Sequence, residues 1–226
     1  MKVNNKMFNQ FNMKVYSFSY QPLSMLSSIF KSDIGLNVIQ GGFTAEPKPM
    51  NLVCLFRNKL DISKFIQNIT ENTPTIIDID DGFRYECYYL GGTSPANEIW
   101  NGWYKVTFPF NTIQQSKEMH KIALKNTVNK IVNYGTYESP CVIEIVPTTN
   151  IPQLKIGDYT VKNLVANQKF VIDGIKKKVY SNDENRFFDV EFKNNRFPFL
   201  KTGMNKIDIS SLDNVNVTIK FRNYYI

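Results

Sequence analysis

Three aspartates stand close together in the first half of the chain and are the first candidates for chemistry: Asp78, Asp80 and Asp81. Paired carboxylates could serve as the acid and base of a glycosidase, and a run of carboxylates could bind calcium. However, Asp80 and Asp81 are followed by Gly82 and lie between two alternating apolar segments, which is the composition of a tight hairpin turn. The sequence therefore predicts a turn here rather than a catalytic or metal site.

The single histidine and the three cysteines offer no further reactive arrangement. His120 has no partner at metal-ligand spacing, and Cys54, Cys87 and Cys141 are isolated from one another. No nucleophile-elbow, zinc-protease, phosphate-loop or dinucleotide-binding motif is present in the sequence. We therefore expect a protein that is not an enzyme and needs no metal or cofactor. His120 is expected at the surface or in packing, and the cysteines are expected as small buried thiols.

The positive charge of the chain raises the question of nucleic acid. The formal net charge is +7 over 226 residues, which permits attraction to acidic polymers. Lysine and arginine are nevertheless spread along the whole chain, and the only tight run, at 176–178, is typical of a solvated hairpin face. Aromatic residues fall on one face of alternating segments, where core packing explains them better than base stacking. No apolar run approaches 18 residues, so we expect no membrane span and no specific nucleic-acid binding.

A different kind of site is suggested by Ile99 and Trp100 in the polar segment EIWNG. Tryptophan is favoured at the energetic centres of protein interfaces. The segment 91–102 reads as a loop, so this apolar pair is a candidate contact with a partner protein. Packing of the pair onto its own domain is the alternative.

The apolar spacing in the first half predicts one helix among strands. One helical face carries Ile62, Phe65, Ile66 and Ile69. Asp61 or Ser63 is the predicted N-cap of this helix. Alternation predicts strands at 15–20, 34–42, 46–56 and 103–111, and a hairpin over 73–90. The first dozen residues, rich in Asn and Lys, are expected to order only against something else.

From residue 112 onward the pattern favours strands. Residues 112–135 contain no clean helical stripe, so we interpret them as a linker that enters a second domain as strand. Further strands are predicted at 141–147, 151–164, 168–181, 186–192 and 197–210. The closing segment predicts Val217, Ile219 and Phe221 in a core, with Lys220 and Arg222 exposed. Short strands at regular spacing predict a mainly β protein built as a sandwich or barrel.

Four segments of the second half, in their order, resemble the distal tail protein of long-tailed, siphovirus-type bacteriophages: NYGTYESPCVIEIV, QKFVIDGIKKKVY, FPFLKTGMNKIDI and VNVTIKFRNYYI. The family's strand entry is matched by Asn133, Gly135, Thr136, Pro140, Ile143 and Ile145. Its strand ending in Ile-Asp and its basic return strand are matched at 171–173 and 176–179, and its closing strand at 217–226. Its turn is matched by Leu200, Gly203, Asn205 and Ile207. This turn lacks the proline that family members often carry, and the chain is short for the family.

The resemblance implies two domains. Residues 1–125 would form an N-terminal, β-sandwich-like ring or belt domain with one helix, and residues 126–226 a C-terminal galectin-like or OB-like β-sandwich. It also implies a structural protein of the virion, assembled in the host bacterial cytoplasm, whose six copies form a hub ring between the tail tube and the tail tip or baseplate. The implied partners are the tail tube protein, the tail-associated fibre or tip protein and receptor-binding proteins, with DNA passing only through the channel. A carbohydrate-binding β-sandwich that recognises host cell-wall saccharide is the alternative.

Overall fold

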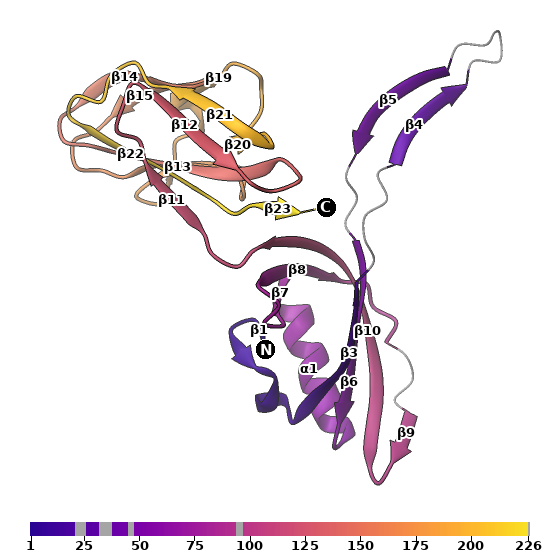
Figure 1. The fold of residues 1–226 in the computed structure, drawn as a ribbon. Coiled ribbons are helices and arrows are strands. Elements are labelled where there is room, and N and C mark those ends of the chain that lie inside the picture. Colours follow the sequence, from indigo (N-terminus) through magenta and orange to yellow (C-terminus); the bar gives the residue numbers. More distant parts are fainter. Residues whose placement is uncertain (21–25, 32–37, 45–47, 94–96, 226) are drawn as a thin grey trace. The chain divides into compact units, whose positions relative to one another are not determined.

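The computed structural model describes residues 1–20, 26–31, 38–44, 48–93 and 97–225. Contacts divide the chain into two compact units, unit 1 at Met1–Gln115 and unit 2 at Ser116–Tyr225. The division that the sequence predicts, between residues 125 and 126, falls inside unit 2. Both units are built mainly of β-strands, and unit 1 contains an α-helix, so the predicted fold class is confirmed (Figure 1).

Unit 1 is an antiparallel sheet with a helix against it. Its elements in chain order are β1 (Lys2–Val3), β2 (Lys6–Met7), the 3-10 helix η1 (Phe8–Phe11), β3 (Met13–Tyr20), β4 (Leu26–Lys31), β5 (Val38–Thr44), β6 (Lys48–Phe56), α1 (Lys59–Glu71), β7 (Thr75–Asp78), β8 (Phe83–Tyr89), β9 (Asn97–Trp100) and β10 (Trp103–Ser116). The strand order of the sheet is β2-β1-β7-β8-β10-β6-β3, with β9 paired to β10. Strands β4 and β5 pair with each other. The first part of the predicted strand 34–42 lies outside the described residues, and β5 contains the rest.

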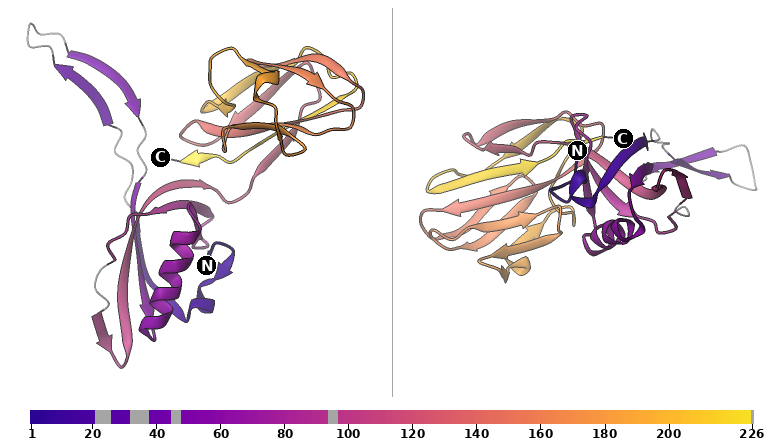
Figure 2. Two further views of the ribbon diagram at one scale, coloured as in Figure 1. Left: turned by 180° about the vertical axis from the view of Figure 1, so that it is seen from behind. Right: turned by 90° about the horizontal axis from the view of Figure 1, so that it is seen from below.

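The helix α1 forms where its apolar spacing predicts it and buries its apolar face against the sheet. Phe65 is fully buried, with its ring centroid 4.9 Å from that of Phe108 in β10 and 6.0 Å from that of Phe56 in β6. Phe11 of η1 closes the cluster with a centroid distance of 5.4 Å to Phe65. Every second residue of β6 is buried, which gives the helix a continuous apolar floor. Figure 2 shows α1 lying along these strands of unit 1.

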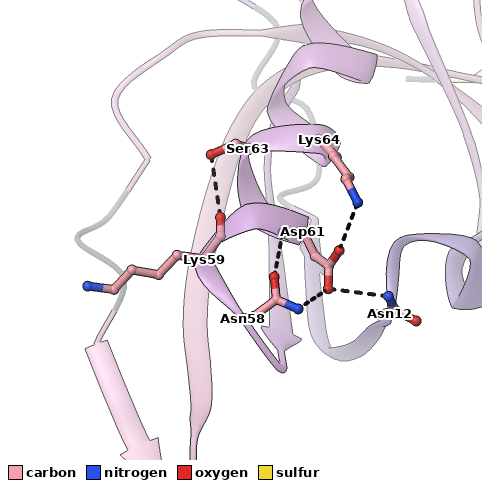
Figure 3. Close-up of polar contacts among 6 residues, drawn as sticks. All are labelled: Asn12, Asn58, Lys59, Asp61, Ser63 and Lys64. Carbon is pink, nitrogen blue, oxygen red and sulfur yellow. Dashed lines mark hydrogen bonds and ion pairs between the residues drawn. The ribbon is translucent and has the colours of Figure 1, made fainter.

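The N-cap of α1 lies three residues before Asp61 and five before Ser63, the two predicted positions. Asn58 is the N-cap, because its side-chain oxygen accepts a hydrogen bond of 2.9 Å from the backbone N–H of Asp61 (Figure 3). The carboxylate of Asp61 is buried and accepts hydrogen bonds from Asn58 Nδ2 at 2.7 Å and from Asn12 Nδ2 at 3.3 Å. Asp61 and Ser63 were therefore the wrong N-cap residues. Asparagine is as good an N-cap as aspartate or serine, so residue type alone could not choose the start of the helix.

The N-terminal segment is ordered within unit 1 itself, so the expectation that it orders only against something else is wrong. Phe8 and Phe11 are buried in the same core as α1, and Val3 is fully buried. The side chain of Asn4 accepts a hydrogen bond of 2.8 Å from the backbone N–H of Ile76 in β7. The many polar residues of this segment do not indicate that its apolar side chains are buried. The burial of these side chains nevertheless outweighs the cost of ordering a short segment.

Unit 2 is a β-sandwich. Its elements are β11 (His120–Ala123), β12 (Val128–Asn133), β13 (Ser139–Pro147), β14 (Ile151–Ile156), β15 (Tyr159–Leu164), β16 (Phe170–Asp173), β17 (Lys178–Ser181), β18 (Glu184–Asn185), η2 (Phe187–Asp189), β19 (Val190–Phe192), β20 (Phe199–Leu200), β21 (Gly203–Asp208), β22 (Val215–Phe221) and β23 (Tyr224–Tyr225). One layer has the strand order β11-β22-β13-β16-β17-β18, and the other contains β12-β21 and β14-β15-β19. Apolar side chains of both layers, such as Ile145, Ile172, Ile156 and Val161, form one core.

Most of the strands predicted for the second half are confirmed. Residues 112–135, which are predicted to enter the second domain as strand, contain the end of β10 and the strands β11 and β12. The strand segment predicted at 168–181 forms the hairpin of β16 and β17. The strand predicted at 186–192 is only partly confirmed, because η2 lies in the first half of this segment and β19 in the second. Arg186 and Asp189 form an ion pair three residues apart, at 2.5 Å, which stabilises the turn of η2.

For the closing segment with β22, the predicted core residues are confirmed, whereas the prediction that Lys220 and Arg222 are exposed is wrong. Val217, Ile219 and Phe221 are buried as predicted. Lys220 and Arg222 are half-buried rather than exposed. Lys220 forms an ion pair of 2.6 Å with Glu144 of β13, and Arg222 donates a hydrogen bond of 2.9 Å to the carbonyl of Ser116. Alternation assigns a face to each residue but does not show what covers that face.

The ion pair on this face gives the protein a pH-dependent contribution to stability. Burial raises the pKa of Glu144, but the hydrogen bond from Lys220 and the charge of Lys169 outweigh burial and hold that pKa below its ordinary value. Because the folded pKa is depressed, the ionised carboxylate stabilises the fold fully above the ordinary pKa of glutamate. That contribution is lost as the pH falls through the folded value.

Glu144→Gln is expected to lower the free energy of unfolding of unit 2 by about 1 kcal/mol at pH 7, since it removes a charge-assisted hydrogen bond. The difference from the wild type should shrink as the pH falls below the ordinary pKa of glutamate and disappear below the depressed pKa of the folded state, where the carboxylate is protonated. Urea titrations over a series of pH values from 7 downward measure both effects. Glu191→Gln is the control, because the ion pair of Glu191 with Lys162 is exposed and should contribute less than about 0.5 kcal/mol. A difference between wild type and Glu144→Gln that does not change with pH would contradict the assignment.

Candidate assembly surface

The face of the unit 1 sheet opposite α1 is the strongest candidate for a functional surface. In β6 and β10 the residues between the buried positions point away from the helix, and they are half-buried or exposed. We call this set the outer sheet face: Lys14, Tyr16, Val53, Leu55, Arg57, Trp103, Lys105 and Thr107. Apolar and aromatic side chains thus lie on a sheet surface together with long basic ones. Tryptophan, tyrosine and arginine, which this set contains, are residue types enriched at protein interfaces.

Cations on the outer sheet face are held over aromatic rings. The guanidinium of Arg57 lies 4.4 Å from the ring centroid of Trp103, and Lys14 Nζ lies 5.3 Å from the same centroid. Lys105 Nζ lies 4.5 Å from the ring of Tyr16. Within the described ranges, none of these three cations has a carboxylate at ion-pair distance. The face therefore carries positive charge that a partner surface with carboxylates would complement.

The edge of the sheet next to this face is formed by β3. It is the last strand in the strand order, and its pairing with β6 shifts register between Val15 and Ser17. Tyr16 lies at this bulge and is 60% exposed. A bulge re-aims side chains and interrupts the regular ladder of a sheet edge, which limits uncontrolled pairing with other chains. The edge and the outer sheet face together present both backbone groups and aromatic side chains to a partner.

The two residues predicted as a partner contact lie in a strand, so the expectation of a loop over the whole of 91–102 is wrong. Ile99 and Trp100 belong to β9, which pairs with the beginning of β10, and Trp100 is opposite Trp103. Ile99 is 49% exposed. The side chain of Trp100 lies outside what the structure describes. The pair therefore adjoins the strand that carries Trp103, and its contact with a partner stays a prediction.

The aspartate cluster is used by the turn between β7 and β8, as the hairpin pattern predicts. The carboxylate of Asp78 accepts a hydrogen bond of 3.0 Å from the backbone N–H of Asp80, and that of Asp81 accepts one of 3.0 Å from Phe83. The hydroxyl of Tyr85 donates to Asp81 at 2.5 Å. Asp80 has a φ of 63°, a left-handed conformation that aspartate tolerates in turns. These bonds account for the cluster as turn chemistry.

The remaining reactive side chains are also engaged in packing. His120 is half-buried against Phe221, with ring centroids 5.1 Å apart, and its Nε2 lies 3.1 Å from Asn223 Nδ2. The three cysteines are free and buried, as predicted, and burial raises the pKa of the Cys141 thiol to about 12. Such a thiol is not a nucleophile at neutral pH. Among the described residues, no group of three or more metal-ligating side chains is placed to hold a metal ion, and no helix is long and apolar enough to cross a membrane.

Trp103 and its neighbours are not among the site residues that the sequence predicts. The alternation at 103–111 predicts a strand, and no functional role is predicted for the residues on its outward face. The signal was nevertheless present, because Trp103, Lys105 and Thr107 share a face by alternation. What could not be predicted was the pairing of β10 with β6 and of β6 with β3. That pairing brings Arg57 over Trp103 and Lys105 over Tyr16.

Comparisons with known proteins agree with this architecture. Residues 134–225 match the family model of the siphovirus-type tail component, C-terminal domain. The chain is similar in fold to the crystal structure of SPP1 Dit, described as a paradigm of the hub adsorption apparatus in phages that infect Gram-positive bacteria. The TM-score is 0.71 at 10% identity, with 96% of this chain and 95% of that chain covered.

Two structures of the phage P2 baseplate in its activated conformation, with Ca and with Sr, match at TM-scores of 0.54 and 0.53. Each is 11% identical and covers 94% and 93% of this chain, respectively, and 90% of the matched chain. No curated protein matches the chain in sequence. The resemblance to siphovirus tail proteins that the motifs indicated is thereby confirmed.

Proposed function

We propose that this protein is a structural hub protein of a siphovirus-type phage tail, and that six copies close into a ring between the tail tube and the tail tip or baseplate. The match of residues 134–225 to the C-terminal domain of siphovirus-type tail components carries the proposal. Similarity in fold to SPP1 Dit over nearly the whole chain supports its extension to unit 1. The role is non-catalytic, and the protein is assembled in the host cytoplasm and becomes part of the virion.

Unit 1 supplies the ring contacts in this proposal. A closed ring needs a heterologous interface, in which two different surfaces of each copy meet. The outer sheet face fits one of these surfaces, because it combines Trp103, Tyr16 and Arg57, the residue types that dominate interface energetics. Its unneutralised cations favour an acidic surface on the neighbouring copy. Ile99 and Trp100 of β9 adjoin this face, and we expect them at the same interface.

Unit 2 supplies the attachment points for other tail proteins. Its sandwich buries its own core, so it does not need the ring to fold. We infer that the tail-associated fibre or tip protein and the receptor-binding proteins attach through this unit, while the tail tube protein contacts the ring. DNA passes through the ring channel without sequence-specific contacts.

The ring is tested by the mass and shape of the purified full-length chain. Six copies of a 26.2 kDa chain give a particle of about 157 kDa, which mass photometry and negative-stain microscopy should detect as a six-fold ring with a central channel. Tyr16→Glu places a carboxylate beside Lys105 and should weaken ring formation at least tenfold, or about 1.4 kcal/mol, without unfolding the monomer.

Tyr134→Glu is the matched control for this variant. Tyr134 is 74% exposed, comparable with Tyr16, but lies in unit 2, so its replacement should leave the ring intact. A chain that stays monomeric at high concentration and shows no ring in images would contradict the proposed function. If the wild type and Tyr16→Glu form rings equally well, the ring interface does not include the outer sheet face.

A further inference from the structure

One layer of unit 2 is interrupted beside β21. This strand pairs with β12 along one edge. On its other edge, an isolated bridge joins Ile209 to Ile156 of β14, and the backbone N–H of Gly157 donates to the carbonyl of Asp208 at 2.7 Å. The chain turns between β14 and β15 at this point. The hairpin of β14 and β15 therefore ends beside the last residue of β21, and among the described residues no strand pairs with the rest of that edge (Figure 1).

The unpaired edge presents backbone hydrogen-bonding groups. The carbonyl of Asp208 points toward β14, whereas the N–H of Ile209 donates to the carbonyl of Thr127 on the β12 side, at 2.7 Å. Alternation along an antiparallel strand then directs the N–H and C=O groups of Met204 and Lys206 away from β12. No described residue bonds to these groups on that side. An edge of this kind is a template for an added strand.

A notch borders this edge and reaches the core of the sandwich. Its volume is about 490 Å³. One wall is β21 itself, and the turn at Gly157 and Asp158 forms the opposite wall. Its floor includes Cys141, Ile143 and Ile219, which belong to the other layer. An extended segment lying along β21 could thus direct one side chain into apolar surroundings while its backbone pairs with the strand.

The rim of the notch is basic. Four lysines and two aspartates line it: Lys155, Lys193, Lys201, Lys206, Asp158 and Asp208. Asp208 forms an ion pair with Lys206 at 3.3 Å, and Asp158 accepts a hydrogen bond of 2.9 Å from the side chain of Asn194. Lys193 and Lys201 have no carboxylate at ion-pair distance within the part of the chain that the structure describes. The charge therefore favours a ligand that brings carboxylates.

We propose that this notch is a docking site for an extended segment of another tail protein. The segment adds as a short strand along residues 204–206, inserts one apolar side chain toward Ile143 and Ile219, and places flanking Asp or Glu residues beside Lys193 and Lys201. The inference rests on the proposed hub function for the kind of partner. It goes beyond that function by assigning the surface, the mode of binding and the chemistry of the bound segment.

A labelled synthetic peptide tests the proposal on the full-length chain. The probe is fluorescein-labelled EVTVE with a blocked C-terminus, and the comparison peptide is KVTVK, both followed by fluorescence anisotropy. EVTVE should bind, and KVTVK should bind at least tenfold more weakly, a difference of about 1.4 kcal/mol. The double variant Lys193→Glu/Lys201→Glu should lower the affinity for EVTVE at least tenfold. The control Lys121→Glu/Lys125→Glu, with the same change of charge in and beside β11, should leave it unchanged.

The backbone part of the proposal is tested by N-methylation of EVTVE at its central residues, which removes strand donors and should also weaken binding tenfold or more. Absence of EVTVE binding up to about 1 mM, equal binding of the two peptides, or equal losses in the two double variants would overturn the proposal. Displacement of EVTVE by cell-wall saccharide would overturn it in favour of a glycan site. Ring formation measured on the same sample separates the two claims, because rings without peptide binding contradict only the notch, and peptide binding without rings contradicts only the ring.

Discussion

Phe65→Ala is expected to lower the free energy of unfolding of unit 1 by about 3–5 kcal/mol, the range for truncating a buried phenylalanine. Phe65 has no exposed surface, and its ring is edge-on to that of Phe108 at 4.9 Å and near those of Phe11 and Phe56. Removing it leaves a cavity lined by three rings from η1, β6 and β10. These rings are held by separate elements, so the cavity cannot close by a small movement of one of them.

The unfolding of unit 1 can be followed separately from that of unit 2. The chain contains two tryptophans, Trp100 and Trp103, and both lie in unit 1, so tryptophan fluorescence in urea reports on this unit. Leu60→Ala is the matched control on the same helix, because Leu60 is 65% exposed and its truncation should change stability by less than about 0.5 kcal/mol. Similar midpoints for the two variants would show that α1 does not anchor the core of unit 1.

Gly174→Ala is expected to destabilise unit 2 by about 3 kcal/mol or more, at the upper end of overpacking effects. A Cβ atom at this position would lie 2.1 Å from the carbonyl oxygen of Pro198 and 2.5 Å from that of Cys141. Both obstacles are backbone atoms, so no side-chain rotation relieves them. The backbone N–H of Gly174 also donates to the Cys141 carbonyl at 2.9 Å, and a shift that removes the clash would weaken this bond.

Gly203→Ala is the matched control, because it introduces backbone strain without a steric clash. Gly203 has a φ of 83°, but a Cβ there meets nothing within 4 Å, so alanine should cost only about 1–2 kcal/mol. Circular dichroism and hydrogen exchange of unit 2 measure both variants, while tryptophan fluorescence should show unit 1 unchanged. A Gly174→Ala protein with the stability of Gly203→Ala would contradict the close approach of the two backbones.

The local features of the fold could be read from the sequence because they depend on residues near one another. The helical face of α1 is set by spacing within two turns, and the turn at Asp80, Asp81 and Gly82 by its own side chains. The buried residues of β22 likewise follow from alternation over seven positions. The ordered motifs of the second half also indicate a resemblance to siphovirus-type tail proteins, and the match of residues 134–225 to that family model confirms the resemblance.

Three of the expectations fail for a different reason, because they depend on segments far apart in the chain. Phe8 and Phe11 are ordered because α1 offers them a surface, and β9 is a strand because β10 is available to pair with it. Lys220 is half-buried because Glu144 lies on the neighbouring strand. Each of these contacts needs the tertiary fold, since composition around the residue itself indicates solvent.

The sequence by itself determined the β class, the place of the helix, the alternation of each long strand and the resemblance to siphovirus tail proteins. All of these are carried by short-range periodicity or by motifs in fixed order. Only the tertiary structure decided which strands are neighbours. Strand neighbourhood brings Arg57 over Trp103 on the outer sheet face, and the early end of the β14–β15 hairpin leaves the edge of β21 open. These candidate surfaces depend on pairings between distant segments. The alternation of residues along one strand does not show which strand pairs with it or in which register.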